Sequence, residues 1–146
     1  GCGVGIIEDV EVVEFGVELI EMYRILIEST GVRLWVPTSR AVGHGMRRPI
    51  EENAIDEVFA MIRDTVAPKD RKNWNRRQRR YRELLMSNDP LQIAELLGEL
   101  TSIAQTKALS FGERKMFERA RGLLEDEFQA VCGDTIGDRM EIALVA

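Results

Sequence analysis

The spacing of apolar residues changes once along the chain, and this change constrains the fold more than any other feature. Residues 4–36 are rich in Val and Ile in short alternating runs, the pattern of β-strands. From Pro49 onward, apolar residues recur every three or four positions, the pattern of amphipathic helices. The sequence therefore predicts an α+β chain in which a small β module, residues 1–48, precedes an all-α helical domain, residues 49–146.

Three strands are expected in the β module. The runs Val4–Val13 and Val17–Ile27 are joined at Phe15–Gly16, which has the composition of a hairpin turn. A short third strand, Arg33–Val36, ends before Pro37. Because three strands are few for such a module and the sequence begins abruptly, we expect that a first strand is missing from it. Strict alternation assigns the side chains of the first strand to two faces, with Ile6, Val10 and Val12 on one and Ile7, Asp9, Glu11 and Val13 on the other.

Four helices and a short C-terminal one are expected after the β module. Asp89 followed by Pro90 marks a helix start, because the carboxylate accepts from an orphan backbone N–H and proline tolerates the first helical position. Ser110–Glu113 has the pattern of a capping box, which marks another start. The expected helices run over about 51–65, over about 73–86, from Pro90, from Phe111, and briefly within 133–146.

Charge is segregated along the chain. The net charge is −5, yet residues 69–82 hold eight Lys and Arg residues and a single Asp. The flanking segments 1–68 and 83–146 are each net acidic. A dense basic block within an acidic protein indicates a local binding site for polyanions such as nucleic acid, while the acidic remainder limits indiscriminate binding. The hydrophobic fraction of 45% indicates a folded chain, and no apolar run reaches the length of a membrane span.

One tryptophan stands inside the basic block. The arginines within residues 76–80 cover much of a helix circumference and would repel one another unless an anion lies nearby. A large apolar ring beside a phosphate-binding surface can insert at a base step, so Trp74 is a candidate DNA wedge. Two alternatives stay open. The arginines could form a merely solvated face, or Trp74 could pack into the helical core, because it shares a helical face with Tyr81 and Leu85.

The sequence offers no catalytic constellation. His44 is the only histidine and lies in a glycine-rich turn without partner groups at metal-ligand or catalytic spacing. Cys2 and Cys132 are far apart and match no metal-binding pattern. No nucleotide-binding, nucleophile-elbow or zinc-protease motif occurs. We therefore expect no enzyme activity, no cofactor, no metal site and no small-molecule substrate, and we expect a cytoplasmic protein with free thiols.

The chain carries three co-linear motifs: W-N-R-R-Q-R at Trp74–Arg79, D-P-L-Q-I-A-E at Asp89–Glu95 and L-S-F-G-E-R-K-M at Leu109–Met116. These motifs resemble those of the CarD/CdnL family of bacterial RNA polymerase-binding transcription regulators. Trp74–Arg79 resembles the family's W-N/S-R-R-Y-R/K. Asp89–Glu95 resembles its G-D/S-x-x-x-I/V-A-E-V segment. Leu109–Met116 resembles its L-S-x-G-E-R/K-x-M helix start. The resemblance covers nearly the whole chain, as far as Val131.

The resemblance implies a Tudor-like β module that docks on the β subunit of RNA polymerase by strand-to-strand pairing. It also implies that the helical domain contacts promoter DNA at the upstream edge of the −10 element, where a tryptophan enters the minor groove and stabilises the melted bubble. The match places that tryptophan at Trp74. Together with the basic block, it gives the candidate DNA-binding residues Trp74, Arg76, Arg77, Arg79, Arg80, Lys72 and Arg82. The candidate polymerase-binding residues are Val13, Trp35 and Pro37.

Two departures from the family pattern affect these assignments. Val13 and Trp35 stand where some relatives have arginine, so an apolar rather than an ionic contact with polymerase is implied, and Gln78 replaces a common tyrosine. The expected function is that of a non-enzymatic, nucleoid-associated regulator that stabilises the open promoter complex by binding the open state better than the closed one. The alternative left open is a stand-alone nucleic-acid-binding protein that acts without polymerase contact.

Overall fold

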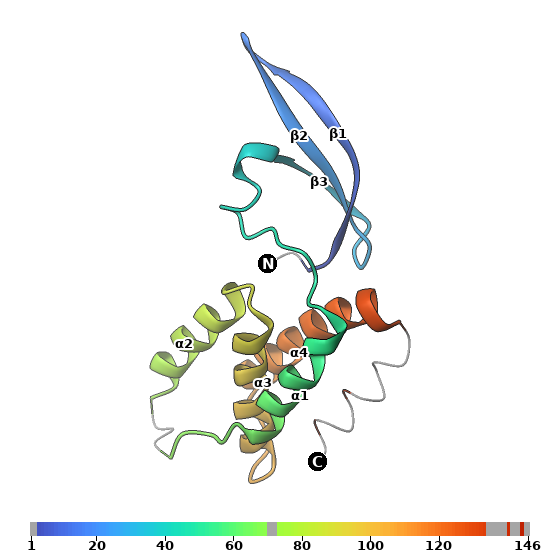
Figure 1. Cartoon of the computed structure of the whole chain (residues 1–146). Helices are drawn as coiled ribbons and strands as arrows, with labels where there is room; N and C mark the ends of the chain where they lie inside the picture. The colour runs from blue at the N-terminus through green and yellow to red at the C-terminus, as the bar shows by residue number, and fades with distance from the viewer. Residues whose placement is uncertain (1–2, 70–72, 134–139, 141–143, 145–146) are drawn as a thin grey trace. The chain divides into compact units, whose positions relative to one another are not determined.

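The computed structural model of the chain describes residues 3–69, 73–133, 140 and 144 (Figure 1). Strands occupy the N-terminal part and helices the rest, which confirms the predicted α+β class. The backbone divides into two compact units after Pro49. We call them the sheet unit and the helical unit.

The sheet unit is built on three antiparallel strands in the order β1-β2-β3. β1 spans Gly5–Phe15, β2 spans Glu18–Ile27 and β3 spans Val32–Pro37. The two hairpin turns place Gly16 and Gly31 at φ angles of 63° and 71°, which glycine adopts without the steric cost that a Cβ would add. The three predicted strands and the predicted turn at Phe15–Gly16 are thereby confirmed.

One extra residue in β1 changes which side chains share a face. The pairing of β1 with β2 is irregular directly after Ile7, where one residue of β1 has no partner. Ile7 pairs with Ile25, and Val10 pairs with Tyr23. Ile7 and Val10 therefore lie on the same face, because alternate residues of β2 project to the same side. The strict alternation predicted for β1 is wrong for Ile6 and Ile7, which exchange faces.

The face that carries Ile7 forms the small core of the sheet unit. Ile25 and Ile27 of β2 are buried on this face. Ala41, which follows the 3-10 turn η1 at Thr38–Arg40, is also buried. Most of β1 is exposed. The residues of β1 on both faces of the sheet are therefore exposed or only partly covered.

The helical unit contains four α-helices within the described residues. A 3-10 turn, η2 at Glu52–Ala54, leads into the first of them. The helices are α1 Ile55–Asp64, α2 Trp74–Met86, α3 Pro90–Ala104 and α4 Phe111–Cys132. Asp89 caps α3, and Ser110 caps α4 in a capping box with Glu113, so both predicted cap motifs are confirmed. The short helix predicted within 133–146 falls largely outside the described residues.

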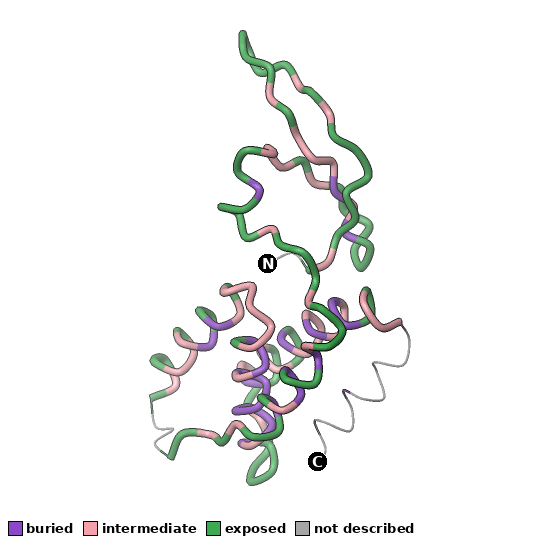
Figure 2. The backbone as a smooth tube through the Cα atoms, in the orientation of Figure 1, coloured by how far each residue is buried: buried purple, intermediate pink, exposed green. Residues whose placement is uncertain are grey.

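The central helix of this unit is α3, which packs against α1, α2 and α4. Most of its turns are buried, as the purple segments in Figure 2 show. Burial of apolar surface around α3 supplies the main stabilisation of the unit. The core consists of Ile55, Val58, Phe59, Ile62, Tyr81, Leu84, Ile93, Ala94, Leu96, Leu97, Leu100, Ile103, Ala120, Leu124, Phe128 and Met140. Among the described residues, no helix has the length and apolar character needed to cross a bilayer.

Candidate nucleic-acid interface

The basic helix α2 begins at a tryptophan. The side chain of Asn73 caps the helix by accepting a hydrogen bond from the backbone N–H of Arg76 at 3.1 Å. Asparagine is favoured at this position, because its oxygen satisfies a backbone donor that has no partner within the helix. Trp74 is thereby fixed in the first turn of α2. Lys72, another candidate from the basic block, lies outside the described residues.

α2 has an inner and an outer face. Tyr81 and Leu84 are buried against the rest of the helical unit. Arg76, Arg79 and Arg82 are exposed and, at a spacing of three residues, follow the side of the helix that points away from Tyr81. We call these three the outer arginines. No ion pair involves them among the residues that the structure describes, so their guanidinium groups are available to an external anion.

Arg80 is held by two carboxylates of α3. Its Nη1 donates to Oε1 of Glu99 at 2.7 Å, and its Nη2 forms a second ion pair with Glu95. The Glu99 side chain is only 5% exposed, so the arginine neutralises a charge that is largely removed from water. Burial alone would lower the pKa of Arg80, but the hydrogen bond and charge of Glu99, with the charge of Glu95, raise this pKa above its ordinary value.

Arg77 points into the helical unit rather than into solvent. Its side chain is 14% exposed, and its Nη1 lies 3.4 Å from Oε2 of Glu113 in α4. Its guanidinium carbon lies 5.1 Å from the ring centroid of Trp74, within the range of a cation–π interaction. Carboxylates of the chain itself therefore offset the charge repulsion among the arginines of α2 at Arg77 and at Arg80.

Trp74 is half-buried between α2 and α4. Its ring packs edge-on against Tyr81, with ring centroids 6.4 Å apart and planes inclined by 65°. On α4, a Cβ built on Gly112 would lie 2.8 Å from Cζ2 of Trp74, so the indole rests directly on the backbone there. The two interpretations of Trp74, as a DNA wedge or as a core residue, are therefore not exclusive, because part of the ring packs and part reaches the surface.

Glu113 links the start of α4 to α2. Its Oε1 accepts from the backbone N–H of Ser110 at 3.0 Å, and its own backbone N–H donates to the Ser110 hydroxyl oxygen at 3.2 Å. Its Oε2 faces Arg77. Burial disfavours the ionised carboxyl, but the hydrogen bonds with Ser110 and the guanidinium of Arg77 together hold the pKa of Glu113 below its ordinary value.

Replacing Glu113 with glutamine is expected to lower the free energy of unfolding of the helical unit by about 1 kcal/mol at neutral pH, because the capping charge and the ion pair are lost. A carboxyl whose pKa is lower in the folded than in the unfolded protein stabilises fully above its unfolded pKa of about 4.3. That stabilisation is lost as the pH falls through the folded value. Urea unfolding between neutral pH and about pH 3 measures the free energy of unfolding of Glu113→Gln and of the parent. The difference between these two free energies should therefore become smaller in acid.

Glu118→Gln is the matched control for this experiment. Glu118 lies on an exposed part of α4, so its replacement should change the free energy of unfolding by less than about 0.5 kcal/mol at any pH. A loss of stability in Glu113→Gln that persists undiminished in acid would contradict the assigned direction of the Glu113 pKa.

The three candidate polymerase-binding residues lie on one face of the sheet. Each pairs with a residue at an alternate position of β2: Val13 with Ile20, Pro37 with Met22 and Trp35 with Arg24. Alternate positions along a strand project to the same face. This face is opposite to the one that buries Ile25, and all three candidates are exposed or partly exposed on it.

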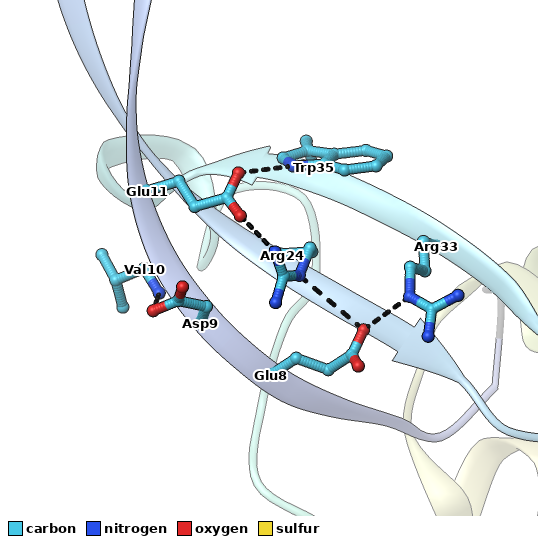
Figure 3. Close-up of polar contacts among 7 residues, drawn as sticks. All are labelled: Glu8, Asp9, Val10, Glu11, Arg24, Arg33 and Trp35. Atoms are coloured by element: carbon cyan, nitrogen blue, oxygen red, sulfur yellow. Dashed lines mark hydrogen bonds and ion pairs between the residues drawn. The ribbon is translucent and has the colours of Figure 1, made fainter.

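Trp35 lies at one end of a network of charged side chains on this face (Figure 3). Nε1 of Trp35 donates to Oε2 of Glu11 at 3.1 Å, and Arg24 pairs with the other oxygen of Glu11. Glu8 accepts from Arg33 at 2.9 Å and lies 3.9 Å from Arg24. The sequence does not predict this network, because Glu8 is the extra residue of β1 and no local signal marks it. The network fixes the Trp35 ring while leaving it 49% exposed.

No group of three or more His, Cys, Asp or Glu side chains within the described part of the chain could hold a metal ion.

The fold and the basic surface of α2 together define a class of protein. In this class a small antiparallel sheet precedes a helical unit, and one basic helix of that unit presents arginines beside an indole. The family described as "CarD, C-terminal domain" matches residues 57–143, which is more than half of the chain. The chain therefore belongs to the CarD family, and the family resemblance of its motifs is confirmed.

A similar protein of Bacillus subtilis (strain 168) is named "Putative transcription factor YdeB". It is 25% identical to this chain over 137 residues, a match that covers 91% of the chain and 86% of the relative. The similarity to this relative therefore extends over both units and is not confined to the helical one.

Proposed function

We propose that the chain is a transcription regulator that binds the β subunit of RNA polymerase through its sheet unit and promoter DNA through α2, and that it thereby stabilises the open complex. Membership of the CarD family and the name of the B. subtilis relative support a role in transcription. One observation carries the DNA-binding part of the proposal. A half-buried indole, Trp74, stands at the head of a helix whose outer arginines face solvent.

The outer arginines would supply affinity without sequence preference. Each guanidinium that neutralises a phosphate releases condensed counterions, so affinity falls as the salt concentration rises, with a logarithmic slope of about 0.9 per phosphate contact. Trp74 would supply the preference for melted DNA, because a ring enters a base step most easily where stacking is already broken. A residue that binds the open state better than the closed one shifts the equilibrium towards the open complex.

The sheet unit offers an edge and a face to polymerase. β1 and β3 are the outer strands of the sheet, and an edge strand can pair with a strand of another protein through backbone hydrogen bonds. β3 carries Trp35 and Pro37, whose side chains project from the face shared with Val13. The contact with polymerase and the contact of α2 with DNA reinforce each other, because binding to polymerase raises the effective concentration of the helical unit at the promoter.

Trp74→Ala is expected to shorten the lifetime of open complexes on a weak promoter by about fivefold or more, because an aromatic contact with a base contributes ~1–3 kcal/mol. The lifetime is measured by adding a competitor to preformed complexes of polymerase, promoter and this protein. Arg79→Ala is the companion variant, because it removes one outer arginine without removing packing and should lower the salt slope of DNA binding by about one. Circular dichroism and melting curves check that both variants are folded at the assay temperature.

Equal lifetimes for Trp74→Ala and the parent would remove the wedge from the mechanism. A pull-down with a fragment of the polymerase β subunit tests the other half of the proposal, with Trp35→Ala as the weakened variant. A parent protein that binds DNA but never binds the β fragment would favour the stand-alone nucleic-acid-binding protein instead.

A further inference from the structure

We propose that Arg77, Gly112 and Glu113 form a seat that holds the Trp74 indole in one orientation, so that Arg77 acts through Trp74 and not as a phosphate contact. We call these three residues the indole seat. The inference rests on the proposed function of Trp74 as the residue that enters DNA. It separates Arg77 from the outer arginines, although all of them belong to the same basic block.

Arg77 makes its printed contacts within the helical unit, with the Trp74 ring and with Glu113. Its guanidinium carbon lies 5.1 Å from the Trp74 ring centroid, and its Nη1 lies 3.4 Å from Oε2 of Glu113. Only 14% of its side chain and 3% of the Glu113 side chain are exposed. Turning Arg77 outward towards a phosphate would therefore break the contact with the ring and leave a buried carboxylate without its counter-charge, which is strongly unfavourable.

Gly112 closes the seat from α4. A Cβ at this position would lie 2.8 Å from Cζ2 and 3.6 Å from Cε2 of Trp74. The first distance is too short for two carbon atoms, so the indole can lie where it does only because residue 112 has no side chain. Tyr81 supports the ring from α2 itself, with an edge-on contact at 6.4 Å between centroids.

The carboxylate of Glu113 ties the seat to the helix cap. One oxygen accepts from the backbone N–H of Ser110, and the other faces Arg77. The first turn of α4 and the first turn of α2 are therefore joined through a single side chain. A tryptophan that is held in place before it meets DNA loses less conformational freedom on binding, which favours the bound state.

Arg76 provides a matched control for Arg77. The two residues are adjacent and carry the same charge, but Arg76 is exposed and Arg77 is turned inward. Substitution by methionine removes one positive charge in either case and keeps an unbranched side chain. A phosphate contact should be lost only in Arg76→Met, whereas the orientation of Trp74 should change only in Arg77→Met.

The first experiment follows the indole alone. The chain has two tryptophans, so Trp35→Phe leaves Trp74 as the only fluorescent indole. In this background Arg77→Met should raise the acrylamide quenching of Trp74, because the guanidinium no longer covers the ring, while Arg76→Met leaves the quenching unchanged. Gly112→Ala should also raise the quenching, because it displaces the ring from the other side while favouring the helix. Unchanged quenching of Trp74 in both Arg77→Met and Gly112→Ala would contradict the proposal that the indole seat holds the Trp74 ring.

The second experiment uses the full chain with Trp35 in place and measures open-complex lifetime and the salt slope of DNA binding. Arg77→Met should shorten the lifetime by about 2- to 5-fold with the salt slope unchanged, whereas Arg76→Met should lower the slope by about one. Arg77→Lys keeps the charge but not the flat stacking group, so its lifetime should fall between those of Arg77→Met and the parent. A slope lowered equally by Arg77→Met and Arg76→Met would overturn the inference. If Trp74→Ala leaves the lifetime unchanged, the proposed function fails instead, and the quenching result still decides whether the seat exists.

Discussion

Gly98→Ala is expected to lower the free energy of unfolding of the helical unit by about 2–3 kcal/mol, although alanine is the better helix former. α1 and α3 pack together at this glycine. A Cβ built on Gly98 would lie 2.7 Å from the carbonyl oxygen of Ile62 and 2.7 Å from Cβ of Thr65. The first atom belongs to the backbone of α1 and the second is attached directly to the backbone of Thr65, the residue after α1, so no side-chain rotation relieves the overlap. The added methyl group can be accommodated only if α1 moves away from the central helix.

Gly122→Ala is the matched control for this substitution. Gly122 lies within α4, and apart from its chain neighbours and the nearby backbone of its own helix, no atom of the described residues lies within 4 Å of a Cβ built on it. Alanine at this position should raise the free energy of unfolding by about 0.5–1 kcal/mol, because glycine is a poor residue in the interior of a helix. Urea unfolding of the two variants and the parent gives both differences. If Gly98→Ala and Gly122→Ala raise the free energy of unfolding by similar amounts, α1 and α3 do not approach each other closely at Gly98.

The helix starts could be predicted from the sequence because their causes are local. Asp89 bonds the backbone of Leu91, and Ser110 and Glu113 bond each other, so each cap is complete within four residues. The close approach at Gly98 depends instead on Ile62, in a different helix. Nothing near Gly98 in the sequence distinguishes it from Gly122, and the two glycines are expected to respond to alanine in opposite directions.

The sheet also shows that contacts between separate elements cannot be predicted from the local sequence. Alternation of Val and Ile predicts the strands, because the period of a strand belongs to the strand itself. The irregularity after Ile7 depends on how β1 pairs with β2, and a single unpaired residue exchanges the faces of everything before it. For this reason the network of Glu8, Arg24 and Trp35 could not be anticipated, although Val13, Trp35 and Pro37 do share a face.

The basic block predicts a cationic helix but does not divide its arginines by role. Helical spacing contains part of the missing information, because Arg77 and Arg80 each precede a buried residue, Tyr81 or Leu84, by four positions and so lie on or beside the inner face. The rest depends on carboxylates that come from α3 and α4. Charge counts along the chain place these carboxylates in the acidic remainder and give no sign that they face the arginines.

Arg80→Met is expected to lower the free energy of unfolding of the helical unit by about 3 kcal/mol, because it leaves the carboxylate of Glu99 without its partner. The Glu99 side chain is 5% exposed, and removing one side of such a pair leaves an uncompensated charge away from water. The Arg80 side chain is 41% exposed, so solvent screens part of the interaction and the loss is placed at the lower end of the range for buried pairs, about 3–5 kcal/mol. Urea unfolding of Arg80→Met and the parent measures the difference.

The double variant Arg80→Met/Glu99→Met separates an internal role of Arg80 from a role in DNA binding. Replacing both partners by apolar side chains removes the stranded charge, and the double variant should recover most of the stability lost in Arg80→Met. Oε2 of Glu99 has no hydrogen-bond partner among the described residues, so the second substitution removes little beyond the bond to Arg80. The salt slope of DNA binding should equal that of the parent, because the outer arginines are intact. A slope lowered by about one would show that Arg80 leaves its carboxylates to meet a phosphate, whereas equal instability of the single and double variants would contradict the ion pair as the source of the loss.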